Sequence, residues 1–242
     1  MAEWFADFKT DFIICFVEKN RWKFIVNGLG NTLKITLFAL ILGIAIGVIV
    51  AVVRSTWDKN GADMRRGFGR GLLRFFNGIC KIYLTVIRGT PVVVQLMIMY
   101  YVIFAASDNG VLVAAIAFGI NSGAYVAEIV RSGIMSVDEG QFEAGRSLGF
   151  NYIQTMRYII VPQAFKVVLP ALANEFITLL KETSVAGYVA VKDLTKGADI
   201  IRGATYQTFM PLMAVAIVYL VMVMFFTWLV SKLERRLRSN ER

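Results

Sequence analysis

Residues 35–53 read ITLFALILGIAIGVIVAVV, a run of 19 amino acids without a charge. A transmembrane helix needs about 20 mostly apolar residues to cross the ~30 Å hydrocarbon core of a bilayer. Residues 212–230, LMAVAIVYLVMVMFFTWLV, form a second uncharged run, and residues 111–127 form a third that only Asn121 and Ser122 interrupt. These stretches predict an integral membrane protein.

The composition favours the same class. Soluble chains are roughly 45–50% apolar and about 25% charged, whereas this chain of 242 residues is 57% hydrophobic and 18% charged. It contains no His and only two cysteines, Cys15 and Cys80. A histidine-based catalytic relay, a histidine metal site, a disulfide framework and a four-thiolate zinc site are therefore excluded. We expect no catalytic residue, no metal and no bound cofactor in this chain.

Two more apolar stretches contain charged residues or proline. We predict spans over residues 82–106 and 167–191. The interrupting residues are Arg88 and Pro91 in the first, and Glu175, Lys181 and Glu182 in the second. The sequence thus predicts an all-α integral membrane protein with five transmembrane helices, and Pro91 is expected to kink the second of them.

The first 27 residues have a different pattern. Their longest apolar run, residues 12–17, is too short for the apolar region of a cleaved signal peptide. Aromatic residues recur there at helical spacing: Trp4, Phe5, Phe8, Phe12 and Phe16. This pattern predicts an amphipathic helix lying in the headgroup plane of the membrane. The alternative is a polar leader without fixed structure.

The distribution of charge predicts the orientation. Three segments are basic, with 15 Lys or Arg against 7 Asp or Glu: residues 54–74, 131–166 and 231–242. The alternating segments hold 7 basic and 7 acidic residues: 1–27, 105–110 and 190–208. Basic residues collect on the cytoplasmic side, so we expect an outer N-terminus and a cytoplasmic tail over residues 237–242. The net charge of +9 is then a topology signal, and we expect no nucleic-acid partner.

The basic segment between the third and fourth spans has helix signals of its own, over about residues 135–165. Ser136 to Glu139 read SVDE, which predicts a capping box. Gly149 predicts a helix stop with a positive φ. A second helix is predicted over residues 152–160, ended by Pro162. Two short helices would form a solid cytoplasmic surface, and the alternative is an interfacial hairpin that only connects two spans.

Within this loop, Glu143-Ala144-Gly145, Gly149 and Ile159-Ile160-Val161-Pro162 resemble the EAA motif of ATP-binding-cassette importer permeases. In that family the loop docks on the cytoplasmic ATPase subunit. The resemblance implies five coupling residues: Glu143, Ala144, Gly145, Gly149 and Pro162. Gly145 stands where the family usually has Ala, and Val161 where it usually has Leu.

The resemblance covers roughly residues 28–236, which we take as the permease domain, and leaves out the N-terminal helix at 1–27. Further matching elements are Arg88-Gly89-Thr90-Pro91 with Gln95-Leu96, then residues 125–131, 162–164, 169–172 and 180–184. Together they are similar to the polar amino-acid branch of the family, whose substrates include His, Glu, Gln, Arg and opines. The resemblance implies the type I importer permease fold, in the cytoplasmic (inner) membrane of a bacterium.

The resemblance also implies partners. The chain would form a dimeric pore with a second copy or a paralogue, surrounded by membrane lipid, and import a polar or charged L-amino acid. An extracytoplasmic amino-acid-binding protein would deliver the solute, and a cytoplasmic ATPase dimer would drive transport. This chain has no G-x-x-x-x-G-K-[ST] phosphate loop, so ATP and Mg would be bound by the ATPase, and the chain itself is not an enzyme.

Ionisable groups inside spans usually face protein or a water-filled path, because exposing them to lipid is costly. We predict a substrate path from these groups and their neighbouring hydroxyls: Arg88, Thr90, Glu128, Glu175, Lys181, Glu182 and Thr183. For Glu128 the alternative is a simple ion pair with Arg131, one turn further along the helix.

The sequence argues against two other functions. A secondary transporter driven by an ion gradient typically shows an internal repeat with interrupted helices, but five spans do not divide into equal halves. A membrane enzyme would need nucleophiles, bases or metal ligands in clusters, which a chain without His does not offer.

Overall fold

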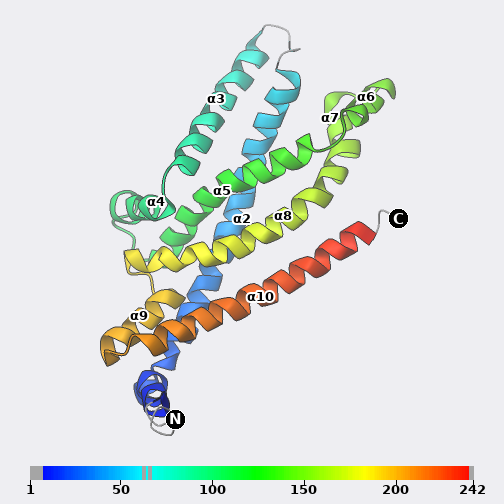
Figure 1. Cartoon of the computed structure of the whole chain (residues 1–242). Coiled ribbons are helices and arrows are strands. Elements are labelled where there is room, and N and C mark those ends of the chain that lie inside the picture. The colour runs from blue at the N-terminus through cyan, green and yellow to red at the C-terminus, as the bar shows by residue number, and fades with distance from the viewer. Residues whose placement is uncertain (1–7, 62–63, 65–66, 240–242) are drawn as a thin grey trace. The chain divides into compact units, whose positions relative to one another are not determined.

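The computed structural model describes residues 8–61, 64 and 67–239 of the chain. Over these residues the secondary structure is helical and contains no β-strand (Figure 1), which confirms the all-α prediction. Trp4 and Phe5 of the predicted interfacial helix lie outside the described residues.

The long helices give four candidate spans, or five with one bent pair, where five were predicted. Within the described chain, four helical segments are long and apolar enough to cross a membrane, and a fifth is counted if the helices on either side of Thr90–Pro91 form one span. The four are α2 (Trp22–Asn60), α5 (Gly110–Met135), the run Tyr152–Val189 and α10 (Phe209–Ser239). The first begins well before residue 28, so the boundary expected there falls inside α2.

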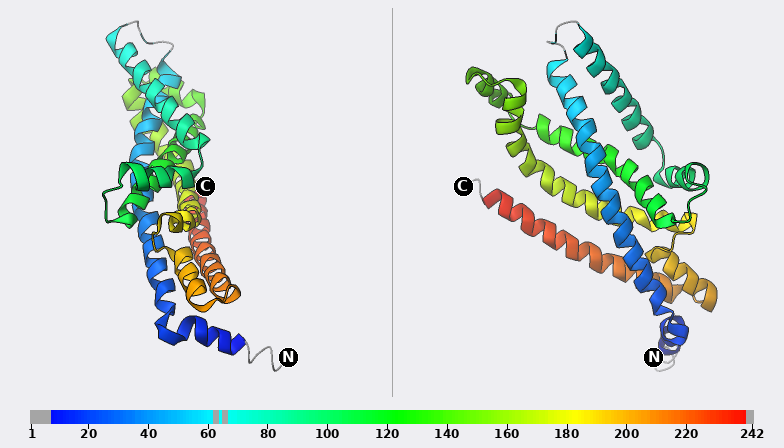
Figure 2. Two further views of the ribbon diagram at one scale, coloured as in Figure 1. Left: turned by 90° about the vertical axis from the view of Figure 1, so that its left-hand side faces the viewer. Right: turned by 180° about the vertical axis from the view of Figure 1, so that it is seen from behind.

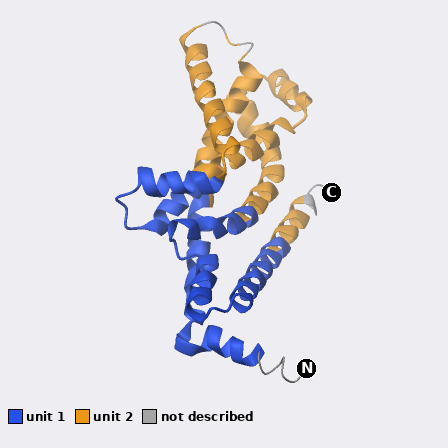
Figure 3. Ribbon diagram, turned by 60° about the vertical axis from the view of Figure 1, so that its left-hand side comes forward, with its two compact units in different colours: residues 1–39, 92–118, 177–228 blue, residues 40–91, 119–176, 229–242 orange. Residues whose placement is uncertain are grey.

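The chain divides into two compact units (Figure 3). Unit 1 comprises residues 1–39, 92–118 and 177–228, and unit 2 comprises residues 40–91, 119–176 and 229–242. Each of α2, α5, α10 and α8 (Val161–Glu182) contributes one part to either unit.

Unit 1 contains a helix that was not predicted. Its shorter elements are η1 (Ile13–Val17), η2 (Glu18–Asn20), α4 (Val92–Ile98), η3 (Met99–Ile103), η5 (Thr183–Val189) and α9 (Leu194–Thr205). Helix α9 occupies most of the segment that was expected to be an outer loop, and it packs closely on the first part of α2. A Cβ added at Gly197 would lie 2.6 Å from the carbonyl oxygen of Phe24, so only glycine allows this approach.

The N-terminal helical turns of unit 1 are held by protein contacts. Cys15 is fully buried and packs with Ile201 and Met210, and Phe16 lies against the same cluster. Arg21 donates a hydrogen bond to the carbonyl oxygen of Ile14. Of the aromatic residues of this region that the structure describes, Phe16 thus packs on α9 and α10, whereas Phe8 and Phe12 are exposed.

Unit 2 is built on an antiparallel pair, the second part of α2 and α3 (Phe68–Gly89) (Figures 1 and 2). The predicted span over 82–106 is wrong about its start, because α3 already begins at Phe68. Arg70 and Arg74 made that part read as a loop, but they lie one turn apart and share one face of the helix. An average of hydropathy along the sequence counts both charges against a membrane span, although the other faces of α3 are apolar.

Pro91 has a stronger effect than the predicted kink. Helix α3 ends at Gly89, Thr90 is extended at φ −123° and ψ 146°, and a new helix begins at Val92. The residue before a proline is pushed out of the helical region by the pyrrolidine ring, so the helix breaks here.

Pro162 does not end a helix, which corrects the prediction. The helical turns α7 (Tyr152–Thr155) and η4 (Met156–Ile160) continue directly into α8. Pro162 occupies the first turn of α8, where a missing N–H is tolerated. The N–H of Val161 bonds to the carbonyl of Met156, a wider π-type turn that carries the chain into α8.

Candidate functional site

The loop that resembles the EAA motif is a compact helix pair in unit 2, formed by α6 (Glu139–Ser147) and by α7 with η4 (Figure 2). Phe142 of α6 packs with Ile134, Ile160 and Ala164 in one buried cluster. Ile153 of α7 lies outside this cluster and is 74% exposed. The two helices thus have a core of their own.

The start of α6 differs from the predicted capping box. Asp138 is the N-cap, and its carboxylate accepts a hydrogen bond from the N–H of Gly140 at 2.7 Å. Ser136 instead donates to the carbonyl of Gly133 at 2.8 Å. Because the backbone of Ser136 still continues the last turn of α5, its side chain bonds backward along that helix.

The end of α6 confirms the predicted turn at Gly149. This residue has φ +80°, a conformation that favours glycine. The N–H of Gly149 bonds to the carbonyl of Arg146 at 2.9 Å, and the N–H of Phe150 bonds to that of Gly145 at 3.0 Å. This pair of bonds is a Schellman motif, which satisfies the last carbonyls of the helix.

Gly145, the departure from the usual EAA pattern, is explained by packing. A Cβ at this position would lie 2.6 Å from the methyl group of Thr155, in the facing helix α7. The two helices approach so closely here that alanine would force them apart. The other four predicted coupling residues, Glu143, Ala144, Gly149 and Pro162, are exposed. The motif therefore has one buried glycine and an outward surface.

An ion pair fixes α6 to the end of α2. Lys59 Nζ lies 2.5 Å from Glu139 Oε2 and 4.4 Å from the ring centroid of Phe142. A cavity of about 190 Å³ borders this contact. Its lining residues are Lys59, Asn60, Glu139, Phe142, Arg146, Tyr152 and Thr155. A displacement of α6 would therefore pull on α2. This link was not predicted from the sequence.

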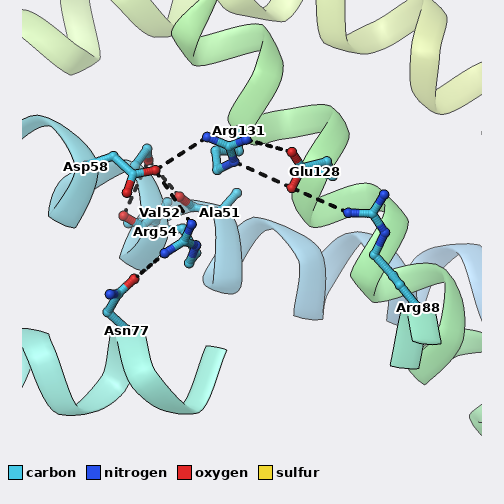
Figure 4. Close-up of polar contacts among 9 residues, drawn as sticks. Ala51, Val52, Arg54, Asp58, Asn77, Arg88, Glu128 and Arg131 are labelled. Carbon is cyan, nitrogen blue, oxygen red and sulfur yellow. Dashed lines mark hydrogen bonds and ion pairs between the residues drawn. The ribbon is translucent and has the colours of Figure 1, made fainter. Parts of the chain in front are cut away.

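Charged residues of α2, α3 and α5 form a cluster within unit 2 (Figure 4). At its centre Arg131 Nη2 lies 2.6 Å from Glu128 Oε1, and Arg131 Nη1 lies 3.4 Å from Asp58 Oδ2. The pairing of Glu128 with Arg131, the alternative noted from the sequence, is thus present. It is one part of a larger network.

The network extends to both sides of this centre. Arg88 Nη1 of α3 lies 3.9 Å from Glu128 Oε2, and the guanidinium stacks 5.7 Å from the ring centroid of Tyr125. On the other side, Arg54 donates to the amide oxygen of Asn77 at 2.8 Å and lies 3.9 Å from Asp58. The Arg88 side chain is 45% exposed and that of Glu128 is 32% exposed. The structure thus brings these two predicted path residues together, and both side chains keep exposed surface in the single chain.

The remaining path candidates lie elsewhere. In unit 2, Glu175 accepts a hydrogen bond from Ser122 at 2.8 Å, and Thr90 donates to the carbonyl of Val86. In unit 1, Lys181 and Glu182 occupy the last turn of α8, inside the helical run Tyr152–Val189 that is long and apolar enough to cross a membrane, as expected.

The structure corrects the role given to Thr183. This residue is fully buried, and its hydroxyl donates to the carbonyl of Leu180 at 3.0 Å. It has no surface to offer a solute in this conformation. Of the three neighbouring candidates only Lys181 is exposed.

A polar region around α9 was not predicted from the sequence. Asp193 is the N-cap of this helix, is fully buried, and accepts a hydrogen bond from the N–H of Lys196 at 2.8 Å. Burial raises the pKa of Asp193 to about 6, although its backbone hydrogen bonds oppose the shift. A cavity of about 360 Å³ lies beside it, lined by Ser184, Gly187, Tyr188, Thr195, Lys196, Asp199, Arg202 and Leu212.

Comparison with known proteins agrees with this geometry. Residues 67–239 match the family described as binding-protein-dependent transport system inner membrane component. The arginine transport system permease protein ArtQ of Bacillus subtilis is 35% identical over 221 residues, which cover 90% of this chain and 94% of that protein. The glutamine transport system permease protein GlnP of Escherichia coli K12 is 35% identical over 210 residues, covering 85% of this chain and 90% of that protein.

Solved structures agree in fold. A chain from the crystal structure of an amino acid ABC transporter with histidines has a TM-score of 0.79 and 39% identity, with 91% of this chain and 98% of that chain covered. A chain of the inward-facing MetNI methionine ABC transporter has a TM-score of 0.75 at 19% identity, with 91% and 99% covered. The second likeness bears on the fold alone. The chain belongs to the family of inner membrane components of binding-protein-dependent transport systems.

Proposed function

We propose that this chain is the permease subunit of an ATP-driven importer that carries a polar or charged L-amino acid into the bacterial cytoplasm. The observation that carries the proposal is the likeness over nearly the whole chain, at 35% and 39% identity, to proteins named for arginine and amino acid transport. The exposed charges of Arg88 and Glu128 in unit 2 suit a zwitterionic solute, which needs polar groups to replace its water shell. ATP and Mg would belong to the partner ATPase.

The ATPase partner would dock on the exposed face of α6 and the loop that follows it. Leu148 is 71% exposed directly before the turn at Gly149, in a segment that the charge distribution assigns to the cytoplasm. Large apolar side chains on an otherwise polar surface are typical of a protein interface. Glu143, on the same helix, offers a carboxylate for a charge-assisted hydrogen bond to a basic partner residue.

A second copy or a paralogue would complete the pore, and an extracytoplasmic amino-acid-binding protein would deliver the solute. Many large apolar residues of α3 and α10 are exposed in the single chain. Lipid and a second permease subunit together would cover such surfaces.

The test is reconstitution in proteoliposomes with the ATPase and the binding protein from the same transport system. We expect uptake of arginine, glutamine or another polar amino acid only with ATP inside the vesicle and binding protein outside. Uptake should persist when ionophores collapse the ion gradients. Uptake that runs on an ion gradient without ATP would contradict the proposal and favour the secondary transporter.

A further inference from the structure

The last turn of α2 holds the start of α6 at two points. The ammonium of Lys59 lies 2.5 Å from Glu139 Oε2 and 4.4 Å from the ring centroid of Phe142. Glu139 and Phe142 are three positions apart, so they share one face of α6. Only 13% of the Lys59 side chain is exposed. We call these three residues the α2–α6 junction.

The residue before Lys59 belongs to the charged cluster of unit 2. Asp58 Oδ2 lies 3.4 Å from Arg131 Nη1 of α5 (Figure 4). Successive positions of a helix point about 100° apart, so Lys59 reaches α6 while Asp58 reaches α5. One turn of α2 therefore connects the helix proposed to meet the ATPase with the charged cluster.

The charged cluster leads on to the end of α3. Arg131 Nη2 lies 2.6 Å from Glu128 Oε1, and Arg88 Nη1 lies 3.9 Å from Glu128 Oε2. Arg88 is in the last turn of α3, directly before the break in that helix. A continuous series of charged residues thus runs from α6 to two predicted path residues, all of them within unit 2. In order, the series is Glu139, Lys59, Asp58, Arg131, Glu128 and Arg88.

The ion pair of the junction adds little to the stability of the fold. Glu139 is 64% exposed, and ion pairs with an exposed partner contribute little to stability. Helix α6 is also anchored by Phe142, in its buried cluster, and by the close approach at Gly145. The junction differs from these anchors because its partner is α2, the helix that carries Asp58.

We propose that Lys59 is a positioning residue for transport, through which movement of α6 changes the pairing of Arg88 with Glu128. The inference rests on the proposed docking of the ATPase on α6. When the ATPase displaces α6, the junction displaces the last turn of α2, and Asp58 moves relative to Arg131. Ion pairs joined by a rigid helix can carry such a change between two sites. The Glu128 carboxylate is then shared differently between Arg131 and Arg88, at the end of α3.

The experiment uses the transporter assembled from this chain, its ATPase and its binding protein in proteoliposomes. Three quantities are measured: co-purification of the ATPase, stimulation of ATP hydrolysis by solute-loaded binding protein, and uptake. Lys59→Met should keep co-purification at the wild-type level, because Lys59 offers little surface to a partner. Stimulation and uptake should both fall about fivefold or more, the lower range of coupling between sites. The melting temperature in detergent should fall by no more than about 2–4 °C.

Exchange of the two charges separates the ion pair from a local defect. Lys59→Glu alone and Glu139→Lys alone each place like charges together and should reduce stimulation about tenfold. The double variant restores an ion pair and should recover to within about threefold of the wild type. Recovery is incomplete because a carboxylate does not replace the ammonium beside the Phe142 ring.

A second double variant tests the link to the charged cluster. Asp58→Asn should reduce stimulation as Lys59→Met does. The two substitutions together should be no worse than the stronger one alone, because both interrupt the same series of contacts. The matched control is Gln163→Ala, which removes the hydrogen bond of 3.2 Å from α8 to Gln141 of α6 and should leave stimulation unchanged.

Five results would overturn the inference. They are wild-type stimulation and uptake in Lys59→Met, no recovery in the charge exchange, losses from Asp58→Asn and Lys59→Met that multiply, an equal loss in Gln163→Ala, and loss of ATPase co-purification in Lys59→Met. The last result would make Lys59 part of the docking surface. If a charge reversal does not assemble, Lys59→Met and its control still decide.

The wild-type transporter distinguishes this inference from the proposed function. A wild type without ATP-driven uptake would refute the proposed function and the inference with it. A wild type that takes up solute with ATP, beside variants that match it, would refute the inference alone.

Discussion

Helices α6 and α9 are both short, both connect long helices, and both begin with an aspartate that accepts a backbone N–H, yet they present opposite surfaces. In α6 only Phe142 and Gly145 are buried, and the N-cap Asp138 is exposed. In α9 four residues are buried, and the N-cap Asp193 has no exposed surface. The buried residues of α9 are Leu194, Gly197, Ala198 and Ile201.

Helix α6 therefore exposes most of its surface to possible partners, whereas α9 completes the core of its unit. The contacts that hold α9 are all made within its own unit, so its sequence is constrained by packing. Helix α6 is held by one apolar anchor, one close glycine, the ion pair to Lys59 and a hydrogen bond that Gln163 donates to Gln141, and its other residues are exposed. Substitutions should therefore damage folding in α9 and function in α6.

The largest effect is expected from Gly197→Val in α9. The new side chain would collide with the carbonyl oxygen of Phe24, which a Cβ would meet at 2.6 Å. We expect a loss of about 3 kcal/mol, the upper range for overpacking, and a melting temperature in detergent lower by about 6–12 °C. The matched control is Gly203→Val on the same helix, where a Cβ meets nothing within 4 Å. Equal melting of the two variants would contradict the packing of α9 on α2.

The next effect tests the open surface of α6. Gly149→Asp adds a Cβ at φ +80° and a charge on the face proposed to meet the ATPase. The protein should still insert, and its stability should fall by only about 1 kcal/mol, because Asp tolerates positive φ better than most residues and nothing lies within 4 Å of the new Cβ. We nevertheless expect at least tenfold slower uptake and loss of ATPase binding in a pull-down.

Two further variants define the cause of that loss. Gly149→Asn adopts positive φ as readily without the charge and should retain most uptake, whereas Glu143→Lys reverses the charge on the same surface and should also uncouple. Normal uptake by both Gly149→Asp and Glu143→Lys would contradict the proposal that the ATPase docks on α6 and the loop that follows it.

The same two helices show what a sequence can predict. The turn at Gly149 was predictable, because one residue type accounts for it. The ion pair between Lys59 and Glu139 was not, because its partners are 80 positions apart. Helix α9 was also missed, since residues 190–208 mix charge, glycine and apolar residues, and its amphipathic face has meaning only against α2. The start of α3 was missed for a related reason, since the charges of Arg70 and Arg74 lie on one face of the helix and this is evident only once the helix is known.

The buried N-cap of α9 predicts a dependence on pH. Burial raises the pKa of Asp193 from 3.8 to about 6 in the folded chain, so the folded state holds its proton at pH values where the unfolded state has lost it. Stability should therefore fall as pH rises from about 4 to 6 and stay low above that range. Between pH 5 and 7 we expect a loss of about 1 kcal/mol, or about 2–4 °C in melting temperature.

Asp193→Asn is the matched variant. Its amide oxygen can still accept the N–H of Lys196, but it cannot ionise, so its melting temperature should not share this decline between pH 5 and 7. Parallel curves for the two proteins would show that the burial of Asp193 is not coupled to stability.

The smallest effect concerns the last turn of α8, where an exposed residue and a half-buried residue are adjacent. Successive positions of a helix point about 100° apart, so Lys181 and Glu182 cannot both face one point of a path. Lys181 is exposed and Glu182 is half-buried.

We expect Lys181→Met to change the preference among acidic, neutral and basic amino acids by about two- to fivefold, the range of one exposed charge interaction of up to about 1 kcal/mol. Glu182→Gln should mainly lower the melting temperature of the assembled transporter. Each variant is tested by competition uptake and by a melting curve in detergent. If both variants behave like the wild type in the two assays, Lys181 and Glu182 neither line the substrate path nor contribute to packing.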